Sequence, residues 1–304
     1  MEHVLTVGVV SFHPAWGDKD LNISRICGYV RACARRGADI AVLPETALSG
    51  YSDDPNPIRE EKMHRAVAET IPGPATEAVC AITKQYGVYA VFGMPERDGG
   101  HVYNSAAVCM PDGSVKSYRK IHLPLSEINW ADSGENPLLF NTQWGPVGVG
   151  ICYDAFEYPE LARYYRAKGA RLMLNPCAVS TQVGSSHQNN SLRAAAVSSQ
   201  LYIASANIFG SDADLQFLGG CGIVGPGDLR TGCAQYAGKP FGAADANRGE
   251  MYIATIDLSY VQQTIISDMF EGGHRTGRPD WRPDLYKRWL EDVLDDPQWM
   301  AKFD

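Results

Sequence analysis

The sequence predicts an α/β fold with two similar sheets and helices on their outer sides. Short apolar segments typical of buried strands alternate with segments of helical periodicity. Two stretches also repeat, because residues 35–44 resemble residues 167–176 and residues 85–93 resemble residues 200–207. A repeated strand–helix–strand–helix–strand unit implies two similar sheets, and chance similarity between generic α/β segments is the alternative. The 304 residues, 45% of them hydrophobic, suffice for a large core.

The first half of the chain reads as strands separated by two helices. One helix contains Ile23, Ile26 and Val30 at helical spacing and ends at Gly37, and another begins at Pro74 and ends at Gly87. The strands are predicted at residues 5–12, 38–45, 88–93, 101–110 and 114–120.

The second half repeats this pattern and ends in a tail. A buried strand at residues 147–151 leads to Cys152, and Pro159 begins a helix. Residues 194–211 read as a helix followed by a strand. Further strands are predicted at residues 218–224, 231–236 and 251–256. We expect one domain at 1–280, and a tail at 281–304 whose amphipathic helix packs on the domain or on a partner subunit.

Composition excludes several classes of protein. The net charge of −8 is spread along the chain, which argues against a nucleic-acid partner. No apolar run is long enough for a membrane span, and the first residues lack the features of a secretory signal. Eight cysteines show no spacing typical of zinc sites, so we expect reduced thiols, no metal and a cytoplasmic location. Dinucleotide, phosphate-loop and serine-hydrolase motifs are also absent from the sequence.

Three polar residues stand at the ends of apolar strands: Glu45, Lys120 and Cys152. Carboxyl ends of strands converge on the ligand crevice of α/β folds. A carboxylate can take the proton of a thiol, and an ammonium can stabilise an oxyanion, so this chemistry requires no cofactor. Each residue also has a structural interpretation: Glu45 as a loop cap, Lys120 as a solvated strand end and Cys152 as core packing.

The same residues lie in motifs that resemble those of the carbon–nitrogen hydrolase family, also called the nitrilase superfamily. Order and spacing agree from about residue 5 to residue 286. The matching segments are residues 43–51 (Leu-Pro-Glu-Thr-Ala-Leu-Ser-Gly-Tyr), 103–105 (Tyr-Asn-Ser), 118–123 (Tyr-Arg-Lys-Ile-His-Leu), 148–160 (Gly-Val-Gly-Ile-Cys-Tyr-Asp-Ala-Phe-Glu-Tyr-Pro-Glu) and 282–286 (Arg-Pro-Asp-Leu-Tyr).

The resemblance implies a four-layer α-β-β-α sandwich, often assembled into dimers or higher homo-oligomers. It implies a Glu-Lys-Cys triad with Cys152 as nucleophile, Glu45 as general base and acid, and Lys120 as stabiliser of the oxyanion. A second glutamate of the family corresponds to Glu127, with Glu135 as the alternative. The backbone N–H of Tyr153 would also contact the oxyanion.

Substrate contacts are harder to predict from sequence. We expect Tyr51, Trp130, Tyr153 and Cys177 near the substrate, with packing in the core or a loop as the alternative for Tyr51 and Trp130 and packing as the alternative for Cys177. The chain also has one more residue between Cys152 and the following Pro-Glu pair than the common family pattern. That residue should bulge the turn beside the pocket.

These features predict a cysteine-dependent hydrolase of a non-peptide C–N bond in a small carboxamide or N-carbamoyl substrate. The products would be an acid and ammonia or an amine, formed through a thioester. Tyr-Asp after the cysteine resembles amidases more than nitrilases, which usually carry Trp-Glu there. A nitrilase is the first alternative, and a non-catalytic interaction protein on the same scaffold is the second.

Overall fold

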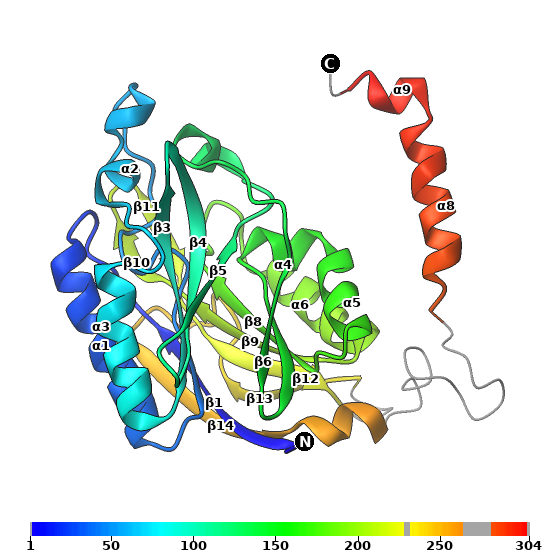
Figure 1. Ribbon diagram of the computed structural model, residues 1–304, viewed down its shortest axis with the longest axis horizontal. Helices are drawn as coiled ribbons and strands as arrows, with labels where there is room; N and C mark the ends of the chain where they lie inside the picture. The colour runs from blue at the N-terminus through cyan, green and yellow to red at the C-terminus, as the bar shows by residue number, and fades with distance from the viewer. Residues whose placement is uncertain (1, 228–231, 264–280, 303–304) are drawn as a thin grey trace. The chain divides into compact units, whose positions relative to one another are not determined.

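The structure is a computed structural model that describes residues 2–227, 232–263 and 281–302. The chain divides into two units, residues 1–261 and residues 262–304. The first unit contains two six-stranded mixed sheets and a small two-stranded sheet (Figure 1).

The strands of the two large sheets follow matching orders. In spatial order, the first sheet is β14 (Glu250–Asp257), β1 (Val4–Ser11), β2 (Ile40–Val42), β3 (Tyr89–Asp98), β4 (His101–Cys109) and β5 (Val115–Arg119). The second is β6 (Leu138–Thr142), β7 (Gly145–Val149), β8 (Leu172–Cys177), β9 (Tyr202–Asn207), β12 (Gly222–Pro226) and β13 (Cys233–Gly238).

This correspondence confirms the repeat predicted from the sequence. In each sheet three consecutive strands are parallel, β1–β2–β3 in one and β7–β8–β9 in the other. Antiparallel strands flank both trios, one strand on one side and two on the other. Each parallel connection passes through a helix, as right-handed crossovers between parallel strands require.

Helices cover the outer faces of both sheets (Figure 1). Helix α1 (Lys19–Arg35) packs against β2, and α3 (Pro74–Tyr86) packs against β3 and β4. On the other side, α5 (Pro159–Ala167) packs against β7, and α6 (Ser186–Ser199) packs against β9 and β12. The predicted four-layer α-β-β-α sandwich is therefore confirmed.

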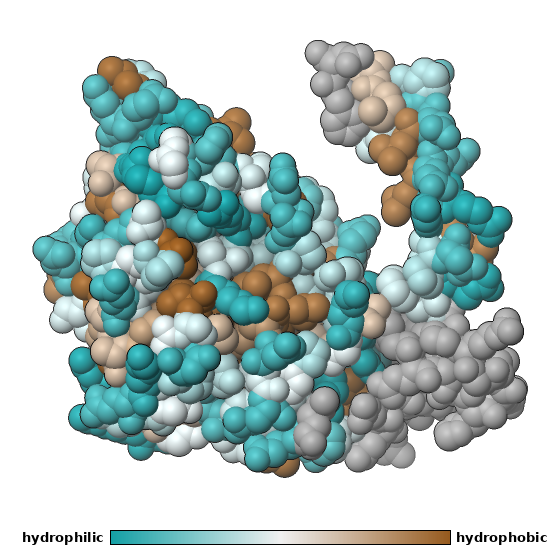
Figure 2. Space-filling model, in the orientation of Figure 1, coloured by the Kyte–Doolittle hydropathy of each residue, from teal (hydrophilic) through white to brown (hydrophobic). Residues whose placement is uncertain are grey.

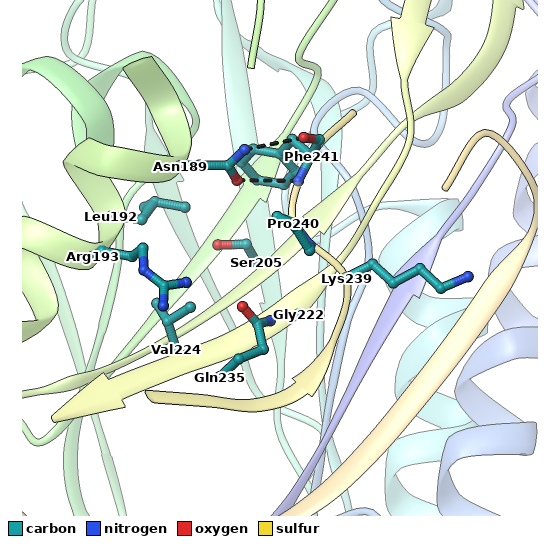
Figure 3. Close-up of a pocket in the computed structure, with 10 residues that line it drawn as sticks. All are labelled: Asn189, Leu192, Arg193, Ser205, Gly222, Val224, Gln235, Lys239, Pro240 and Phe241. Carbon is teal, nitrogen blue, oxygen red and sulfur yellow. Dashed lines mark hydrogen bonds between the residues drawn. The ribbon is translucent and has the colours of Figure 1, made fainter. Parts of the chain in front are cut away.

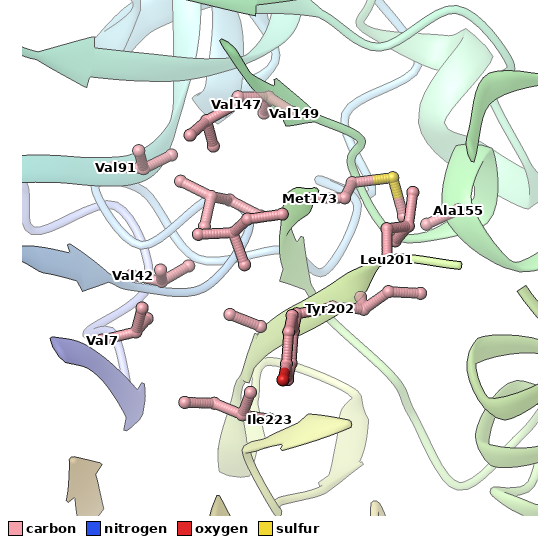
Figure 4. Packing of buried hydrophobic residues seen from close by; sticks show 14 of the residues in the cluster. Val7, Val42, Val91, Val147, Val149, Ala155, Met173, Leu201, Tyr202 and Ile223 are labelled. Carbon is pink, nitrogen blue, oxygen red and sulfur yellow. The ribbon is translucent and has the colours of Figure 1, made fainter. Parts of the chain in front are cut away.

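The main core lies between the two sheets. Val7, Val42 and Val91 point from the first sheet toward Val147 and Val149 of the second, and all five are buried (Figure 4). A second core cluster fills the space between the first sheet and helices α1 and α3. Strands buried on both faces explain the continuous apolar runs in the sequence.

Local signals explain where the helices begin and end. The Asp18 carboxylate accepts a hydrogen bond from the Leu21 amide and caps α1 at its N-terminus. Gly87 ends α3 in the left-handed conformation with φ of 69°, which glycine adopts without a steric penalty. The remaining short elements of this unit are α2 (Met63–Val67), α4 (Tyr153–Glu157), β10 (Phe209–Asp212), β11 (Leu215–Leu218), and the 3₁₀ helices η1 (Arg59–Glu61), η2 (Leu125–Asn129) and η3 (Leu258–Gln263).

One predicted strand is wrong. Residues 218–224 do not form a single strand, because β11 ends at Leu218 and β12 begins at Gly222 in a different sheet. Gly219 and Gly220 between them have φ of 63° and 85°, which ends the extended conformation. The strand predicted at 231–236 corresponds to β13, and its first residue lies outside the described residues.

On the face drawn in Figure 2, hydrophilic residues of the first unit surround a cluster of hydrophobic ones near its middle. Among the described residues, no helix combines the length and the apolar character needed to cross a bilayer. The second unit contains α8 (Pro283–Leu294) and α9 (Pro297–Met300), and the exposed apolar residues of α8 include Trp289 and Leu290. The expected packing of this tail, and the domain boundary at 280, stay predictions.

Candidate active site

The three polar residues predicted at strand ends are buried in the first unit. Glu45 follows β2, Lys120 follows β5, and Cys152 follows β7 in the second sheet. The side chains of Glu45 and Lys120 are fully buried, and Cys152 is 8% exposed. Ionisable side chains are costly to bury without partners, so their contacts decide what they do.

Lys120 is held between two carboxylates. Its Nζ donates hydrogen bonds to Glu45 Oε1 at 2.7 Å and to Glu127 Oε1 at 2.5 Å. Asn104 from β4 connects the same two carboxylates, since its Nδ2 donates to Glu45 Oε1 at 2.8 Å and to Glu127 Oε2 at 2.9 Å. Strand ends from the first sheet and the 3₁₀ helix η2 thus form one network of charge-assisted hydrogen bonds.

Tyr51 extends this network toward the surface. Its hydroxyl donates to Glu127 Oε1 at 2.6 Å. The Asp212 carboxylate fixes the backbone of this turn, because it accepts hydrogen bonds from the amides of Tyr51 and Ser52. Glu135, the alternative second glutamate, lines a different cavity on the surface. The structure therefore brings Glu127, and not Glu135, to Lys120.

The two carboxylate oxygens of Glu45 differ in their hydrogen bonds. Oε1 accepts the two hydrogen bonds from Lys120 and Asn104, whereas the buried Oε2 has no hydrogen-bond partner among the described residues. Burial raises the pKa of Glu45 to about 7, with Glu127 adding to the rise and Lys120 opposing it. A carboxyl group poised near neutral pH with a free oxygen is suited to accept and return a proton.

Lys120 stays protonated in this site. Burial alone would lower the pKa of Lys120, but the carboxylates of Glu127 and Glu45 raise it above its ordinary value. An ammonium group has three hydrogen-bond donors, and the two carboxylates accept two of them. One N–H therefore remains to interact with a ligand.

Cys152 lies on a sharp turn between β7 and α4. Its backbone has φ of 47° and ψ of −107°, a conformation that is strained for a residue with a side chain. The Cys152 amide donates to Pro176 O at 2.9 Å and to Asn175 Oδ1 at 3.0 Å, which holds this strained conformation in place. Burial, together with the charge of Glu45, raises the pKa of Cys152 well above its ordinary value. The thiol is therefore neutral at rest and requires a base before it can react.

Asp154 connects the cysteine turn to the strand that carries Lys120. Its carboxylate accepts hydrogen bonds from the amides of Ile121 at 3.0 Å and His122 at 2.9 Å, and from the Tyr118 hydroxyl at 2.7 Å. His122 Nδ1 lies 2.7 Å from the same carboxylate. These contacts fix the two sheets relative to each other beside the site.

A cavity of about 860 Å³ opens beside Cys152. That volume is in the range of small-molecule sites. Its lining comes from helices α4 and α6, the 3₁₀ helix η2, strand β11 and several loops, and comprises Tyr51, Asp53, Pro124, Leu125, Ser126, Cys152, Tyr153, Phe156, Glu157, Ala178, Val179, Ser180, Gln182, Val183, His187, Gln188, Asp214 and Leu215.

A second cavity lies between α6 and the β12–β13 pair (Figure 3). Its volume is only about 20 Å³, which is room for about one water molecule. Asn189 closes it by exchanging two hydrogen bonds with the backbone of Phe241, at 3.0 Å and 3.1 Å. This cavity is too small for a substrate.

The family model for carbon–nitrogen hydrolases matches residues 6–266 of the chain. The chain belongs to this family. The predicted resemblance and the predicted enzyme class are thus confirmed: the protein is a hydrolase that acts on C–N bonds other than peptide bonds.

Omega-amidases are among the relatives that the chain resembles. Omega-amidase NIT2 of Xenopus tropicalis is 36% identical over 200 residues, which cover 62% of this chain and 69% of the relative. Omega-amidase NIT2 of Homo sapiens is 34% identical over the same length, with the same coverage.

Solved structures of the family share the fold. A variant of the Nesterenkonia sp. AN1 amidase, from the nitrilase superfamily, matches with a TM-score of 0.72 and 22% identity, covering 95% of this chain and 98% of that chain. Another variant of this amidase, with acrylamide added at its active-site cysteine, matches with a TM-score of 0.71 and 22% identity, over 94% of this chain and 99% of that chain.

Two residues expected near the substrate lie elsewhere in this hydrolase. Trp130 is 1% exposed and stacks on His64, with ring centroids 4.3 Å apart. Cys177 is fully buried, because β8 continues through this residue and the cavity lining begins at the following Ala178. Burial, together with Cys152 and Glu45 close by, raises the pKa of the Cys177 thiol. Both residues pack in the interior, which corrects the expectation. Tyr51 and Tyr153 do line the cavity.

The segment between Cys152 and Pro159, which is one residue longer than the common family pattern, contains helix α4 and a single linking residue. Helix α4 ends at Glu157, Tyr158 leaves the helical conformation, and α5 begins at Pro159. The Tyr158 ring stacks on His122 with centroids 3.4 Å apart, in a separate surface groove. Tyr158 therefore lies in this groove, whereas Phe156 and Glu157 line the large cavity. The bulge expected from the extra residue stays a prediction.

Sequence reasoning missed four polar residues that shape the site: Asn104, Asp154, Asn175 and Asp212. Asn104 and Asp154 lie inside the recognised motifs, and this position was the signal available in the sequence. Both side chains are buried in the structure. Asp212 ends β10, a strand that the sequence pattern does not predict. Among the described residues, no group of three or more ligating side chains could hold a metal ion.

Proposed function

We propose that this hydrolase cleaves small carboxamides or N-carbamoyl groups through a thioester at Cys152, with Glu45, Lys120 and Glu127 completing the catalytic set. The observation that carries the proposal is the free Oε2 of Glu45, on a buried carboxyl group with a pKa of about 7. Burial and the charge of Glu45 raise the pKa of the Cys152 thiol, so the thiol needs a base such as Glu45 before it can attack.

In the first step the Cys152 sulfur attacks the carbonyl carbon of the amide, and its proton moves to Glu45. A C–S bond forms as the carbonyl π bond becomes an oxyanion. The remaining N–H of Lys120 and the backbone N–H of Tyr153 stabilise that charge. Tyr153 is suited to this role, because it is the first residue of α4 and its N–H has no partner within the helix.

In the second step the tetrahedral intermediate collapses. Glu45 gives its proton to the leaving nitrogen, the C–N bond breaks, and ammonia or an amine departs. The acyl group stays on Cys152 as a thioester. Glu45 is again a carboxylate, and Lys120 and Asn104 hold its Oε1 so that Oε2 keeps its direction.

In the third step water attacks the thioester. Glu45 takes one proton from that water, the C–S bond breaks, and the proton returns to the sulfur. The carboxylic acid product then leaves through the cavity. Glu127 supports both half-reactions by holding Lys120 at 2.5 Å, and the Tyr51 hydroxyl holds Glu127 in turn.

An amide is the favoured substrate over a nitrile for two reasons. The relatives of known name are omega-amidases. Tyr153 and Asp154 replace the Trp-Glu pair usual in nitrilases, and Asp154 is committed to bracing the site.

The test is ammonia release from a panel of short aliphatic amides, ureido acids and nitriles. The native protein should release ammonia from amides or ureido acids, and Cys152→Ala should release none. Cys33→Ala is the matched control, since it removes another buried thiol, in the core cluster beside α1 and outside the cavity lining, and should keep the activity. Activity that survives in Cys152→Ala would refute the mechanism. Ammonia release from nitriles, without release from amides or ureido acids, would show that the substrate is a nitrile.

A further inference from the structure

The charged groups that line the large cavity have one sign. Asp53, Glu157 and Asp214 contribute carboxylates, and His187 contributes an imidazole. Neither lysine nor arginine is present among the described residues of the lining. A substrate that enters this cavity therefore meets a negative electrostatic potential.

The three carboxylates differ in how far other groups neutralise them. Asp53 is paired with Lys62, whose Nζ lies 3.0 Å from Asp53 Oδ1. Glu157 Oε1 lies 2.6 Å from His187 Nε2, a contact that removes negative charge only when the imidazole is protonated. Asp214 is exposed and has no ion-pair partner in the described part of the chain.

Gln188 adds an uncharged acceptor to this wall. Its side chain is 7% exposed and lines the cavity, yet its Oε1 has no hydrogen-bond partner among the described residues. A buried amide oxygen without a partner costs free energy, which a donor on a bound ligand would offset. The unsatisfied group of the wall is thus an acceptor, in agreement with the sign of the charges.

Apolar side chains line the same cavity as these acceptors and the reactive cysteine. Phe156, Val179 and Leu215 line the cavity together with Cys152. Methylene groups of a substrate would pack on these residues, and a polar end group would lie among the acceptors.

From this arrangement we infer that the acyl chain of the preferred substrate carries a positively charged amino group beyond a few methylenes, and that carboxylate-ended amides are disfavoured. The inference rests on the proposed function, because it concerns the substrate of the same site. An ammonium group supplies three donors and a positive charge, and the lining offers acceptors and negative charge. A carboxylate in its place would lose water without gaining a cationic partner.

The first test compares three amides of equal length: pentanamide, 5-aminopentanamide and the anionic monoamide of pentanedioic acid. We expect kcat/KM to be highest for the cation and lowest for the anion, with a ratio of about tenfold or more between them. Asp214→Asn and Glu157→Gln should each lower the cation-to-neutral ratio by about two- to fivefold, the usual range for an exposed ion pair. Asp20→Asn, an exposed charge loss on α1 outside the lining, should leave the ratio unchanged.

A second readout does not depend on amide turnover. The rates at which 2-aminoethyl and 2-sulfonatoethyl methanethiosulfonate modify Cys152 are measured by peptide mass mapping and normalised to a small free thiol. The cationic reagent should react about tenfold faster or more, and Asp214→Asn should reduce that preference.

The outcomes separate the two proposals. Equal or faster hydrolysis of the anionic amide would overturn the inference and leave the proposed function standing. If the protein hydrolyses none of the three amides, the result counts against the proposed function. The ratio of the two methanethiosulfonate rates would then decide the inference alone, and a preference for the sulfonate would overturn it.

Discussion

Glu127→Gln should move the acid limb of the pH profile to lower pH. Burial and the nearby Glu127 raise the pKa of Glu45 to about 7. In the proposed mechanism Glu45 acts as a base in its deprotonated form, so kcat/KM rises as pH passes through that pKa. Removal of the Glu127 charge lowers the pKa of Glu45, because an ionised Glu45 then meets less repulsion while Lys120 still attracts it.

The size of this effect follows from the geometry. Lys120 Nζ lies 2.7 Å from Glu45 Oε1 and 2.5 Å from Glu127 Oε1. These two oxygens are therefore no farther apart than the sum of those distances, about 5 Å, where two unit charges interact with about 3 kcal/mol at an effective dielectric constant of about 20. Since 1.36 kcal/mol corresponds to a tenfold change in an equilibrium, the midpoint should fall by about two pH units.

The assay is kcat/KM for ammonia release from an uncharged amide, between about pH 4 and about pH 9. The plateau of Glu127→Gln should also fall, because glutamine presents an N–H where Lys120, Tyr51 and Asn104 donate. The midpoint does not depend on plateau height. Glu135→Gln removes the same charge from another cavity and is the control. A midpoint that stays in place or rises, or an equal shift in the control, would refute the reasoning.

Three further substitutions test other parts of the account. Gly93→Ala would place a Cβ 2.2 Å from Thr46 N and 2.5 Å from Glu45 Cα, so kcat should fall about 100-fold as the base moves; unchanged kcat would contradict this. Asp154→Asn replaces a carboxylate that accepts several hydrogen bonds, so the free energy of unfolding in urea should fall by about 2 kcal/mol. An unchanged free energy of unfolding would show that Asp154 does not stabilise the site. Trp130→Phe should lower the free energy of unfolding by about 1 kcal/mol with KM unchanged, and a large rise in KM would return it to the substrate site.

The sequence was most informative where buried strands end. Glu45, Lys120 and Cys152 stand out because charged or reactive groups follow uncharged runs, and the motifs around them have a fixed order. The repeat at residues 35–44 and 167–176 likewise predicted two sheets of matching strand order, since helix-to-strand joints carry strong glycine and apolar signals.

Contacts between distant segments could not be read from the sequence. Asn104 sits in a quoted motif, but its link between two carboxylates depends on strand pairing that places β4 beside β3. The sequence also could not show which residue after β8 reaches the cavity. Cys177 is a core residue, whereas the next residue, Ala178, lines the cavity. The position of Asp214 in the cavity could not be predicted from the sequence, because the fold alone brings the β10–β11 hairpin to the cavity.

The central claim is that a covalent acyl group forms on one particular sulfur, and mass spectrometry of the enzyme quenched in acid during amide turnover tests it most directly. The account predicts a mass increase equal to the acyl group, mapped to the peptide that contains Cys152, and lost in Cys152→Ala. Steady turnover with no adduct at any time after mixing, or with an adduct on another cysteine, would contradict it.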